Sequence, residues 1–302
     1  GGAGRWVLTH LRKNLLDAGG GKLLEGLEFL VIDTDERETI NGRQVPVSFA
    51  GVEIAPENVF VLDENLQHEI SEWAKKDEPL PEHAGWFSAL AYKGLDQELN
   101  LATGTYGRRS LPRVALLRNL RGVQEPASRW HKKQREQGRS TDLSQRLKER
   151  CDRAYREDRD QLRIFVIGSL AGGMSGLLLD VANLVRQIAN QIVTSSGTVR
   201  VEGYLLDGVL FESLPGSPGA GEQRLANTFA SWREIARWQM NPGLPLDPGW
   251  GESESLDISP FDDIVLSSGR IGRPSNLPEE QYQAMADVIT ARLDRAGRLP
   301  LA

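Results

Sequence analysis

A glycine-rich stretch in the middle of the chain constrains the fold more than any other part of the sequence. It reads GSLAGGMSGLLLD (168–180) and lies between a strand-like run at 164–167 and an apolar helical pattern over 176–193. Glycines between a strand and a helix let the backbone turn sharply and come close to a ligand. The helix amino terminus adds N–H groups and a partial positive charge, so the stretch is suited to binding phosphate. A tight turn that only packs the helix on its strand would use the same residues, and both interpretations stay open at this point.

The rest of the chain alternates between strand-like and helical patterns. Strands are expected at 27–35, 162–167, 198–206 and 261–268, and helices at 5–17, 66–76, 176–193, 223–240 and 279–296. This alternation predicts an α/β fold with a mostly parallel sheet covered by helices on both faces. Such sheets bind ligands at the carboxyl ends of their strands, where loops 1–5, 33–37 and 168–176 are expected. The glycine cluster at 1–4 is typical of a loop that follows a strand, so we expect a further strand ahead of it.

Two common nucleotide-binding motifs fit the sequence poorly. The classical phosphate-binding loop needs Gly-Lys-Ser/Thr at the helix start, and no lysine lies near Gly176. A dinucleotide-binding fold needs GxGxxG after the first strand and an acidic residue about 20 residues later. GGAG at 1–4 followed by IDTD at 32–35 imitates this loosely, with the acid about ten residues late. Neither motif explains a second, richer glycine loop after a mid-chain strand.

Five segments, in this order, are similar to those of one superfamily. They are GGAGRWVLTHL (1–11), FLVIDTDE (29–36), TGTYGRRSLPRVALLRN (103–119), GSLAGGMSGLLLDVA (168–182) and LANTFASWREI (225–235). The chain thereby resembles the tubulin/FtsZ superfamily, most closely its bacterial tubulin-like proteins. The resemblance implies a Rossmann-like GTPase domain of the tubulin/FtsZ type over 1–240, ending in a long core helix. Residues 241–302 would then be the start of a second domain or an elaboration of the first.

The resemblance also implies a site for GTP or GDP. Asp33 and Asp35 end a strand at this edge, where they would either hold water or Mg²⁺ near the phosphates or only cap the following turn. The residues expected at the nucleotide are Gly1, Gly2, Ala3, Gly4, Arg5, Asp33, Asp35, Gly104, Thr105, Ser169, Leu170, Ala171, Gly172, Gly173, Met174, Ser175, Gly176 and Asn227. Among them Asn227 would meet the guanine, and Gly104 and Thr105 would face the terminal phosphate.

Four features depart from the superfamily pattern or leave roles open. Met174 stands near the usual threonine, and a thioether is a poor acceptor with no donor. Arg5 replaces a base-contacting Asn, so it is expected to touch phosphate or solvent. Arg108 and Arg109 are expected to contact phosphate, another subunit or only solvent. The water-positioning acid would come from 241–263, but the sequence does not select one of the candidates Asp247, Glu252, Glu254, Asp257, Asp262 and Asp263.

Composition narrows the function classes. The net charge of −6 argues against bulk binding to nucleic acid, and no apolar run is long enough to predict a membrane span. The histidines lack zinc-ligand spacing, so no metal-binding residues are assigned, and the single cysteine fits a cytoplasmic location. The leading hypothesis is a guanine-nucleotide-binding protein that self-assembles head to tail into filaments or oligomers, with assembly-dependent GTP hydrolysis. The alternatives are a non-catalytic nucleotide-sensing scaffold and a dinucleotide-binding Rossmann oxidoreductase.

Overall fold

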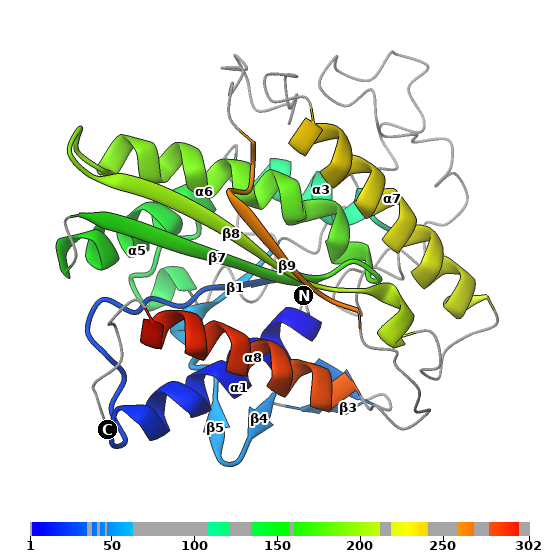
Figure 1. The fold of residues 1–302 in the computed structure, drawn as a ribbon, viewed down its shortest axis with the longest axis horizontal. Coiled ribbons are helices and arrows are strands. Elements are labelled where there is room, and N and C mark those ends of the chain that lie inside the picture. Colours follow the sequence, from blue (N-terminus) through cyan, green and yellow to red (C-terminus); the bar gives the residue numbers. More distant parts are fainter. Residues whose placement is uncertain are drawn as a thin grey trace.

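A three-stranded parallel sheet forms the centre of the protein (Figure 1). It consists of β7 (Gln161–Ser169), β8 (Thr198–Leu206) and β9 (Asp263–Ser267), in that order. In this computed structural model the described residues are 2–34, 38–40, 43–45, 47–62, 108–120, 134–157, 160–211, 219–240, 259–268 and 278–295. The expected strands at 162–167, 198–206 and 261–268 are therefore confirmed, and so is their parallel direction.

Helices cover both faces of this sheet, which confirms the expected α/β class (Figure 1). On one side lie α1 (Gly2–Ala18) and α8 (Pro278–Arg295), which pack against each other. On the other lie α3 (Ser110–Leu120), α5 (Leu143–Glu157), α6 (Leu178–Ile192) and α7 (Ala220–Met240). The single-turn helices η5 (Gly173–Leu177) and η6 (Gly208–Phe211) connect β7 to α6 and follow β8. No described helix has the length and apolarity needed to cross a bilayer.

A second parallel pair lies beside the central sheet but is not joined to it within the described residues. It consists of β1 (Val31–Asp33) and β6 (Val59–Val61). Two short antiparallel hairpins lie between them in sequence, β2 (Glu38–Ile40) with β3 (Arg43–Val45) and β4 (Ser48–Phe49) with β5 (Val52–Glu53), followed by η1 (Pro56–Asn58). The strand expected over 27–35 is thus shorter than predicted, because ladder pairing with β6 extends only from Val31 to Asp33.

Local sequence accounts for where several helices begin and end. Gly20 and Gly21 adopt positive φ angles of 62° and 91° directly after α1, and the Gly21 N–H bonds to the Leu16 carbonyl at 2.7 Å. This is the left-handed turn that glycine makes at a helix carboxyl end, as expected from the Gly19–Gly21 run. At the start of α5, the Asp142 carboxylate accepts the Gln145 N–H at 3.1 Å and so caps the helix.

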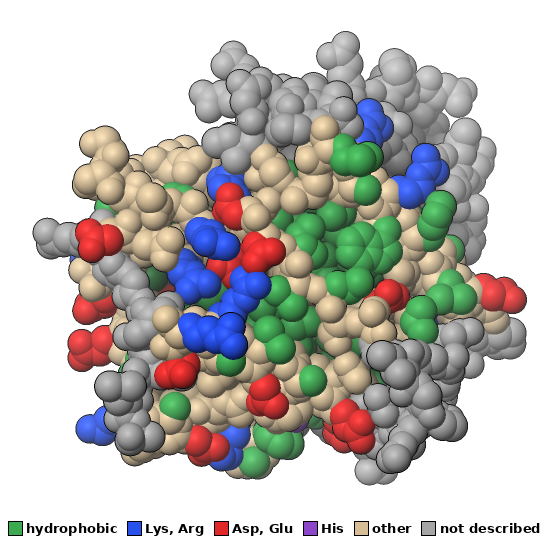
Figure 2. Space-filling model, viewed as in Figure 1, with side chains coloured by type: hydrophobic (Ala, Val, Ile, Leu, Met, Phe, Trp, Pro, Cys, Tyr) green, Lys and Arg blue, Asp and Glu red, His purple; other side chains and the backbone are tan. Residues whose placement is uncertain are grey.

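A buried carboxylate ties the sheet to α8. Glu202 on β8 is fully buried and pairs with Arg163 and Arg292 at 2.7 Å and with Arg200 at 3.1 Å. The Tyr204 hydroxyl donates a further bond to it at 3.0 Å. Arginine and acidic side chains gather over this face, beside a hydrophobic area (Figure 2). Burial alone would raise the pKa of Glu202, but Arg163, Tyr204 and Arg292 outweigh it and hold the pKa below its usual value.

The segment after α7 contributes to the same layers as the rest of the chain. β9 extends the central sheet by pairing with β8, and α8 packs on α1. The domain boundary placed at residue 240 stays a prediction. The helix expected at 66–76 lies outside the described residues.

Candidate nucleotide site at the carboxyl edge of the sheet

The structure brings most of the predicted site residues to one cavity of about 680 Å³. Where β1 and β7 end, the cavity is lined by the first turn of α1 and by the glycine-rich loop. Its lining includes the following predicted residues: Gly2, Ala3, Gly4, Arg5, Asp33, Ser169, Ala171, Gly172, Gly173 and Met174. Gly1, Asp35, Gly104 and Thr105 lie outside the described residues, so their places in the site stay predictions.

The first turn of α1 takes the place of the expected loop 1–5 over residues 2–5, which are the part of that range that the structure describes. Gly2 to Arg5 are helical, and a Cβ atom on Gly4 would lie 2.7 Å from the Ile167 carbonyl oxygen of β7. The glycine therefore allows the helix to pack directly against the strand, and this packing explains why a helix begins among glycines. Arg5 is buried, at 3% exposure, and its guanidinium lies 3.3 Å from the Asp33 carboxylate. Of the two contacts expected for Arg5, burial excludes solvent, and contact with phosphate stays a prediction.

The glycines of the signature loop have different roles. A Cβ atom on Gly168 would lie 2.6 Å from Leu178, and one on Gly176 would overlap the carbonyl oxygen of Arg109. These two positions are glycine because protein atoms approach closely. At Gly172 the opposite holds, since no atom lies within 4 Å of an ideal Cβ and the residue is exposed. Gly172 precedes η5 in an extended conformation, with φ −81° and ψ 170°. Its backbone thus borders open space at the amino end of the η5–α6 segment.

Ser175 links the loop to two helices. Its hydroxyl is buried and accepts a hydrogen bond from Arg109 Nε at 3.0 Å. The same guanidinium makes two bonds to the Glu234 carboxylate of α7, at 3.1 and 2.5 Å. A bidentate Arg–carboxylate pair fixes geometry as well as charge. Arg109, which precedes α3, therefore connects α7 to the glycine-rich loop, and the Ser175 hydroxyl is directed at protein.

Asn227 of α7 holds the glycine-rich loop through a hydrogen bond to its backbone. The residue is 3% exposed, and its amide Nδ2 donates to the Ala171 carbonyl at 2.9 Å. Its Oδ1 accepts a bond from Gln223 on the preceding turn of α7 at 3.0 Å. Both ends of the amide contact protein here, so the geometry shows a role in holding the loop. The base-reading role stays a prediction.

The remaining loop residues mostly face protein. Leu170 is fully buried, and the Ser169 hydroxyl accepts the Ala171 N–H at 3.0 Å. Met174 is partly buried and packs against the hydrophobic core. A thioether in this place fills apolar space at the start of η5. This packing gives a reason for Met174 that does not involve a ligand.

Ion pairs hold the helices on both sides of the loop. Asp180 at the start of α6 is buried and bonds to Arg113 of α3 at 2.9 Å. Burial raises the pKa of Asp180, and the charge of Arg113 acts against that rise. Of the candidate catalytic acids, Asp262 pairs with Arg186 and Asp263 with Arg292, each at 2.7 Å. The other four candidates lie outside the described residues.

Sequence reasoning missed two charged residues of the site, the cationic Arg224 and the acidic Glu234. Arg224 lines the cavity from α7 and donates to the Phe211 carbonyl at 2.8 Å. The available signal was its spacing, because residues 224 and 227 lie three apart and so share one helix face. Glu234 could not be assigned, since its partner Arg109 is 125 residues away in the chain. Within the described ranges, no three His, Cys, Asp or Glu side chains are grouped to hold a metal ion.

Comparison with known proteins gives one match. A family model described as "Tubulin like" matches residues 1–295. No curated protein and no solved structure matches the chain. The matched range contains every described residue of the cavity and of both sheets.

Proposed function

This chain belongs to the tubulin-like family, and we propose that it binds a guanine nucleotide at the glycine-rich edge of the sheet and self-associates head to tail. The observation that carries the proposal is the open space beside the exposed Gly172 backbone. Beside the loop glycines Gly168 and Gly176, by contrast, protein atoms fill the space that a side chain would need. A phosphate group is the ligand that fits a bare backbone at a helix amino end.

The described residues supply charge of the right sign for such a ligand. Arg5 and Arg224 line the same cavity as Gly172, while Asp33 offsets Arg5 through its ion pair. Near the loop, the acidic Asp180 is already neutralised by Arg113. The main chain from Gly172 to Ser175 would hold the phosphates, with Arg224 beside them. Mg²⁺ would enter with the nucleotide, because this ion commonly keeps its waters and binds through phosphates and one or two carboxylates.

Recognition of guanine is assigned to Asn227. Its amide offers both a donor and an acceptor, which is what a purine edge requires. The Ala171 carbonyl and Gln223 hold that amide at the base of the loop. The proposal therefore makes loop position and base selectivity depend on the same side chain.

A non-catalytic nucleotide-sensing scaffold is the second candidate, and one observation favours it. Asp262 and Asp263, the two described candidates for a water-positioning acid, are both held in ion pairs with arginine. A carboxylate engaged in this way orders structure and is less available to orient water. Under this alternative, nucleotide binding would order an interaction surface without turnover.

Two measurements separate these functions. Specific GTP turnover that rises with protein concentration, together with GTP-dependent sedimentation, supports assembly-dependent hydrolysis. Saturable GTP binding with no turnover at any protein concentration supports the scaffold. A competition titration with NADH against a labelled guanine nucleotide tests the oxidoreductase alternative. Binding of NADH without binding of guanine nucleotide would reject the proposal.

A further inference from the structure

A second cavity lies between η1 and the amino-terminal part of α5. Its volume is about 510 Å³, and its lining comes from Glu57 of η1, from residues 138–140 and from α5. Four lining residues are arginines, and we call the cavity the arginine pocket after them: Arg139, Arg146, Arg150 and Arg153. The rest of the lining is polar, acidic or glycine, whereas most small-molecule pockets are lined mainly by apolar side chains. This composition favours a small and highly charged ligand.

The arginine pocket and the proposed nucleotide site lie at opposite ends of the β1–β6 pair. Arg146 donates to the carbonyl of Val59, the first residue of β6, at 3.3 Å. Because the two strands are parallel, Val59 is level with Val31 at the amino end of β1. Asp33 at the carboxyl end of β1 lines the nucleotide edge instead. A ligand in the arginine pocket would therefore occupy a different site from the nucleotide.

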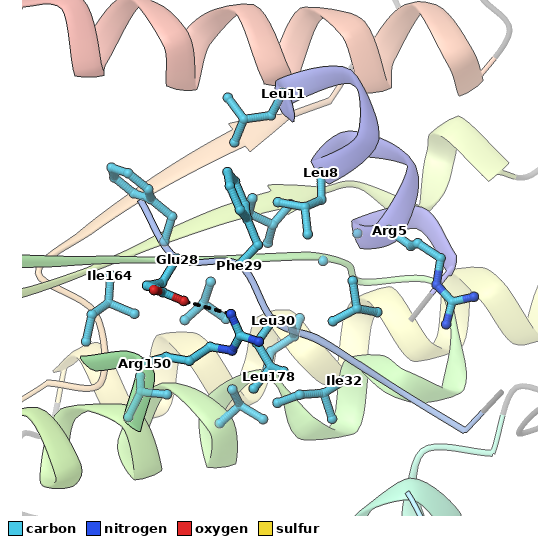
Figure 3. A pocket seen from close by; sticks show the side chains of 18 of the residues that line it. Arg5, Leu8, Leu11, Glu28, Phe29, Leu30, Ile32, Arg150, Ile164 and Leu178 are labelled. Carbon is cyan, nitrogen blue, oxygen red and sulfur yellow. Dashed lines mark hydrogen bonds and ion pairs between the residues drawn. The ribbon is translucent and has the colours of Figure 1, made fainter. Parts of the chain in front are cut away.

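Helical spacing brings three of the arginines to one side of α5. Arg146, Arg150 and Arg153 stand at positions i, i+4 and i+7, so they share one face of the helix. Two of them, Arg150 and Arg153, pair with Glu28 at 2.7 Å each. Figure 3 shows the Glu28–Arg150 pair. The protein itself thus balances part of the positive charge on this face.

Arg146 is balanced less well than its two neighbours. The residue is 5% exposed, and its guanidinium donates to two backbone carbonyls, those of Val59 and Glu57. Within the described part of the chain, Arg146 forms no ion pair with a carboxylate. Burial, followed by the charges of Arg150 and Arg139, lowers the pKa of its guanidinium to about 10, so the group is still charged at pH 7. A buried charge without an ionic partner is costly, and an anion in the pocket would offset that cost.

Arg139 is the most weakly held cation of the pocket. Its guanidinium lies 4.0 Å from the Glu57 carboxylate, and the two side chains are 35% and 52% exposed. Exposed pairs of this kind contribute little free energy, so an anion with stronger acceptors can displace Glu57 from Arg139. Arg139 precedes α5, whereas Arg146 belongs to it. The two cations therefore reach the pocket from different segments.

We propose that the arginine pocket binds a small anion that carries phosphate groups. A phosphate group has three strong acceptor oxygens and can accept hydrogen bonds from more than one guanidinium. A carboxylate has two oxygens, which a single bidentate arginine can engage. Arginines that come from two segments therefore fit phosphate better. The cavity is larger than one phosphate ion requires, so pyrophosphate should bind more tightly than inorganic phosphate. The proposal does not depend on nucleotide binding at the glycine-rich edge.

Isothermal titration with pyrophosphate tests this proposal. The titration uses Gly172→Val protein, so that the glycine-rich edge does not contribute to the signal. We expect one saturable site per chain, weaker binding of inorganic phosphate, and affinity for citrate at least about tenfold below that for pyrophosphate. Pyrophosphate should also slow amide hydrogen exchange over 139–146.

Three substitutions locate the site. Arg139→Gln removes the weakly held cation and should lower the affinity for pyrophosphate at least about tenfold. Glu57→Gln removes the carboxylate that competes for Arg139 and should raise the affinity about two- to fivefold, which loss of a merely structural contact would not do. Arg156→Gln is the matched control, because Arg156 belongs to the same helix, is 70% exposed, pairs with Asp152 and does not line the pocket. Its affinity for pyrophosphate should equal that of the parent.

Four results would overturn the proposal. The first two are absence of pyrophosphate binding to the folded protein and affinity that Arg139→Gln leaves unchanged. The third is citrate bound as tightly as pyrophosphate, which would make the pocket a carboxylate site. The fourth is equal weakening by Arg139→Gln and Arg156→Gln, which would reduce the effect to the overall charge of the helix.

Discussion

Gly172 and Gly176 lie four residues apart in one loop, yet the structure predicts opposite effects for adding a methyl group to each. At Gly172 the methyl would meet no atom within 4 Å, and φ is −81°, which alanine readily adopts. Gly172→Ala should therefore leave the free energy of unfolding unchanged or raise it by up to about 1 kcal/mol, because alanine restricts the unfolded chain. At Gly176 the methyl would overlap the Arg109 carbonyl oxygen and lie 3.1 Å from the Arg109 Cβ. Gly176→Ala should cost about 1–3 kcal/mol, the usual cost of overpacking.

A side chain at Gly172 that the fold tolerates should nevertheless weaken ligand binding. If phosphate lies against its backbone, a side chain there occupies ligand space, and one or two charged hydrogen bonds of about 1.5–3 kcal/mol each are weakened. Gly172→Val should therefore reduce affinity for GTPγS at least tenfold in a protein of unchanged stability. Denaturant unfolding and isothermal titration measure the two effects separately. Unchanged GTPγS affinity in folded Gly172→Val would refute the assignment of this backbone to the phosphates.

The other predictions concern side chains around the loop and the sheet. Asn227→Leu leaves the Ala171 carbonyl without its 2.9 Å hydrogen bond, so the free energy of unfolding in denaturant should fall by about 1–3 kcal/mol. The same substitution should lower the affinity for GTP more than the affinity for ATP. Equal losses for both nucleotides would make Asn227 a packing residue. Glu234→Gln removes the charge partner of Arg109 and should make the start of α3 more mobile, which faster amide hydrogen exchange over 108–114 would show. Unchanged exchange there would mean that the ion pair does not stabilise this end of the helix. Glu202→Gln should lower stability by about 3 kcal/mol at pH 7. Because the pKa of Glu202 is lower in the folded state, its stabilisation is fully present above the unfolded pKa of 4.5 and is lost as the pH falls through the folded pKa. The Tm values of variant and parent should therefore converge below pH 4.5. A difference in Tm that stays constant with pH would contradict this.

The sequence predicted the central layers well because their signals are local. The β-branched and apolar runs of β7 and β8 and the apolar stripe of α6 each specify an element without help from distant residues. The same holds for the Gly19–Gly21 stop after α1, where Gly20 and Gly21 adopt positive φ angles that favour glycine. The parallel order then follows from the alternation of strands and helices.

The parts that sequence reasoning missed depend on tertiary contacts. The glycine cluster at 1–4 is typical of a loop, and glycine is among the poorest helix formers, so a loop was expected at 1–5. Packing of Gly4 against the Ile167 carbonyl outweighs that preference. The contacts of Asn227 with Ala171 and of Arg109 with Glu234 join residues 56 and 125 positions apart, and no local pattern announces them.

The central claim is that the glycine-rich edge binds a guanine nucleotide, and isothermal titration with GTPγS, ATPγS and NADH tests it most directly. We predict saturable binding of GTPγS with one site per chain, affinity for ATPγS at least tenfold weaker, and no binding of NADH. We also predict that Gly172→Val weakens GTPγS binding at least tenfold while the denaturation midpoint stays unchanged. Absence of GTPγS binding to the folded protein, or binding that Gly172→Val leaves intact, would contradict the account.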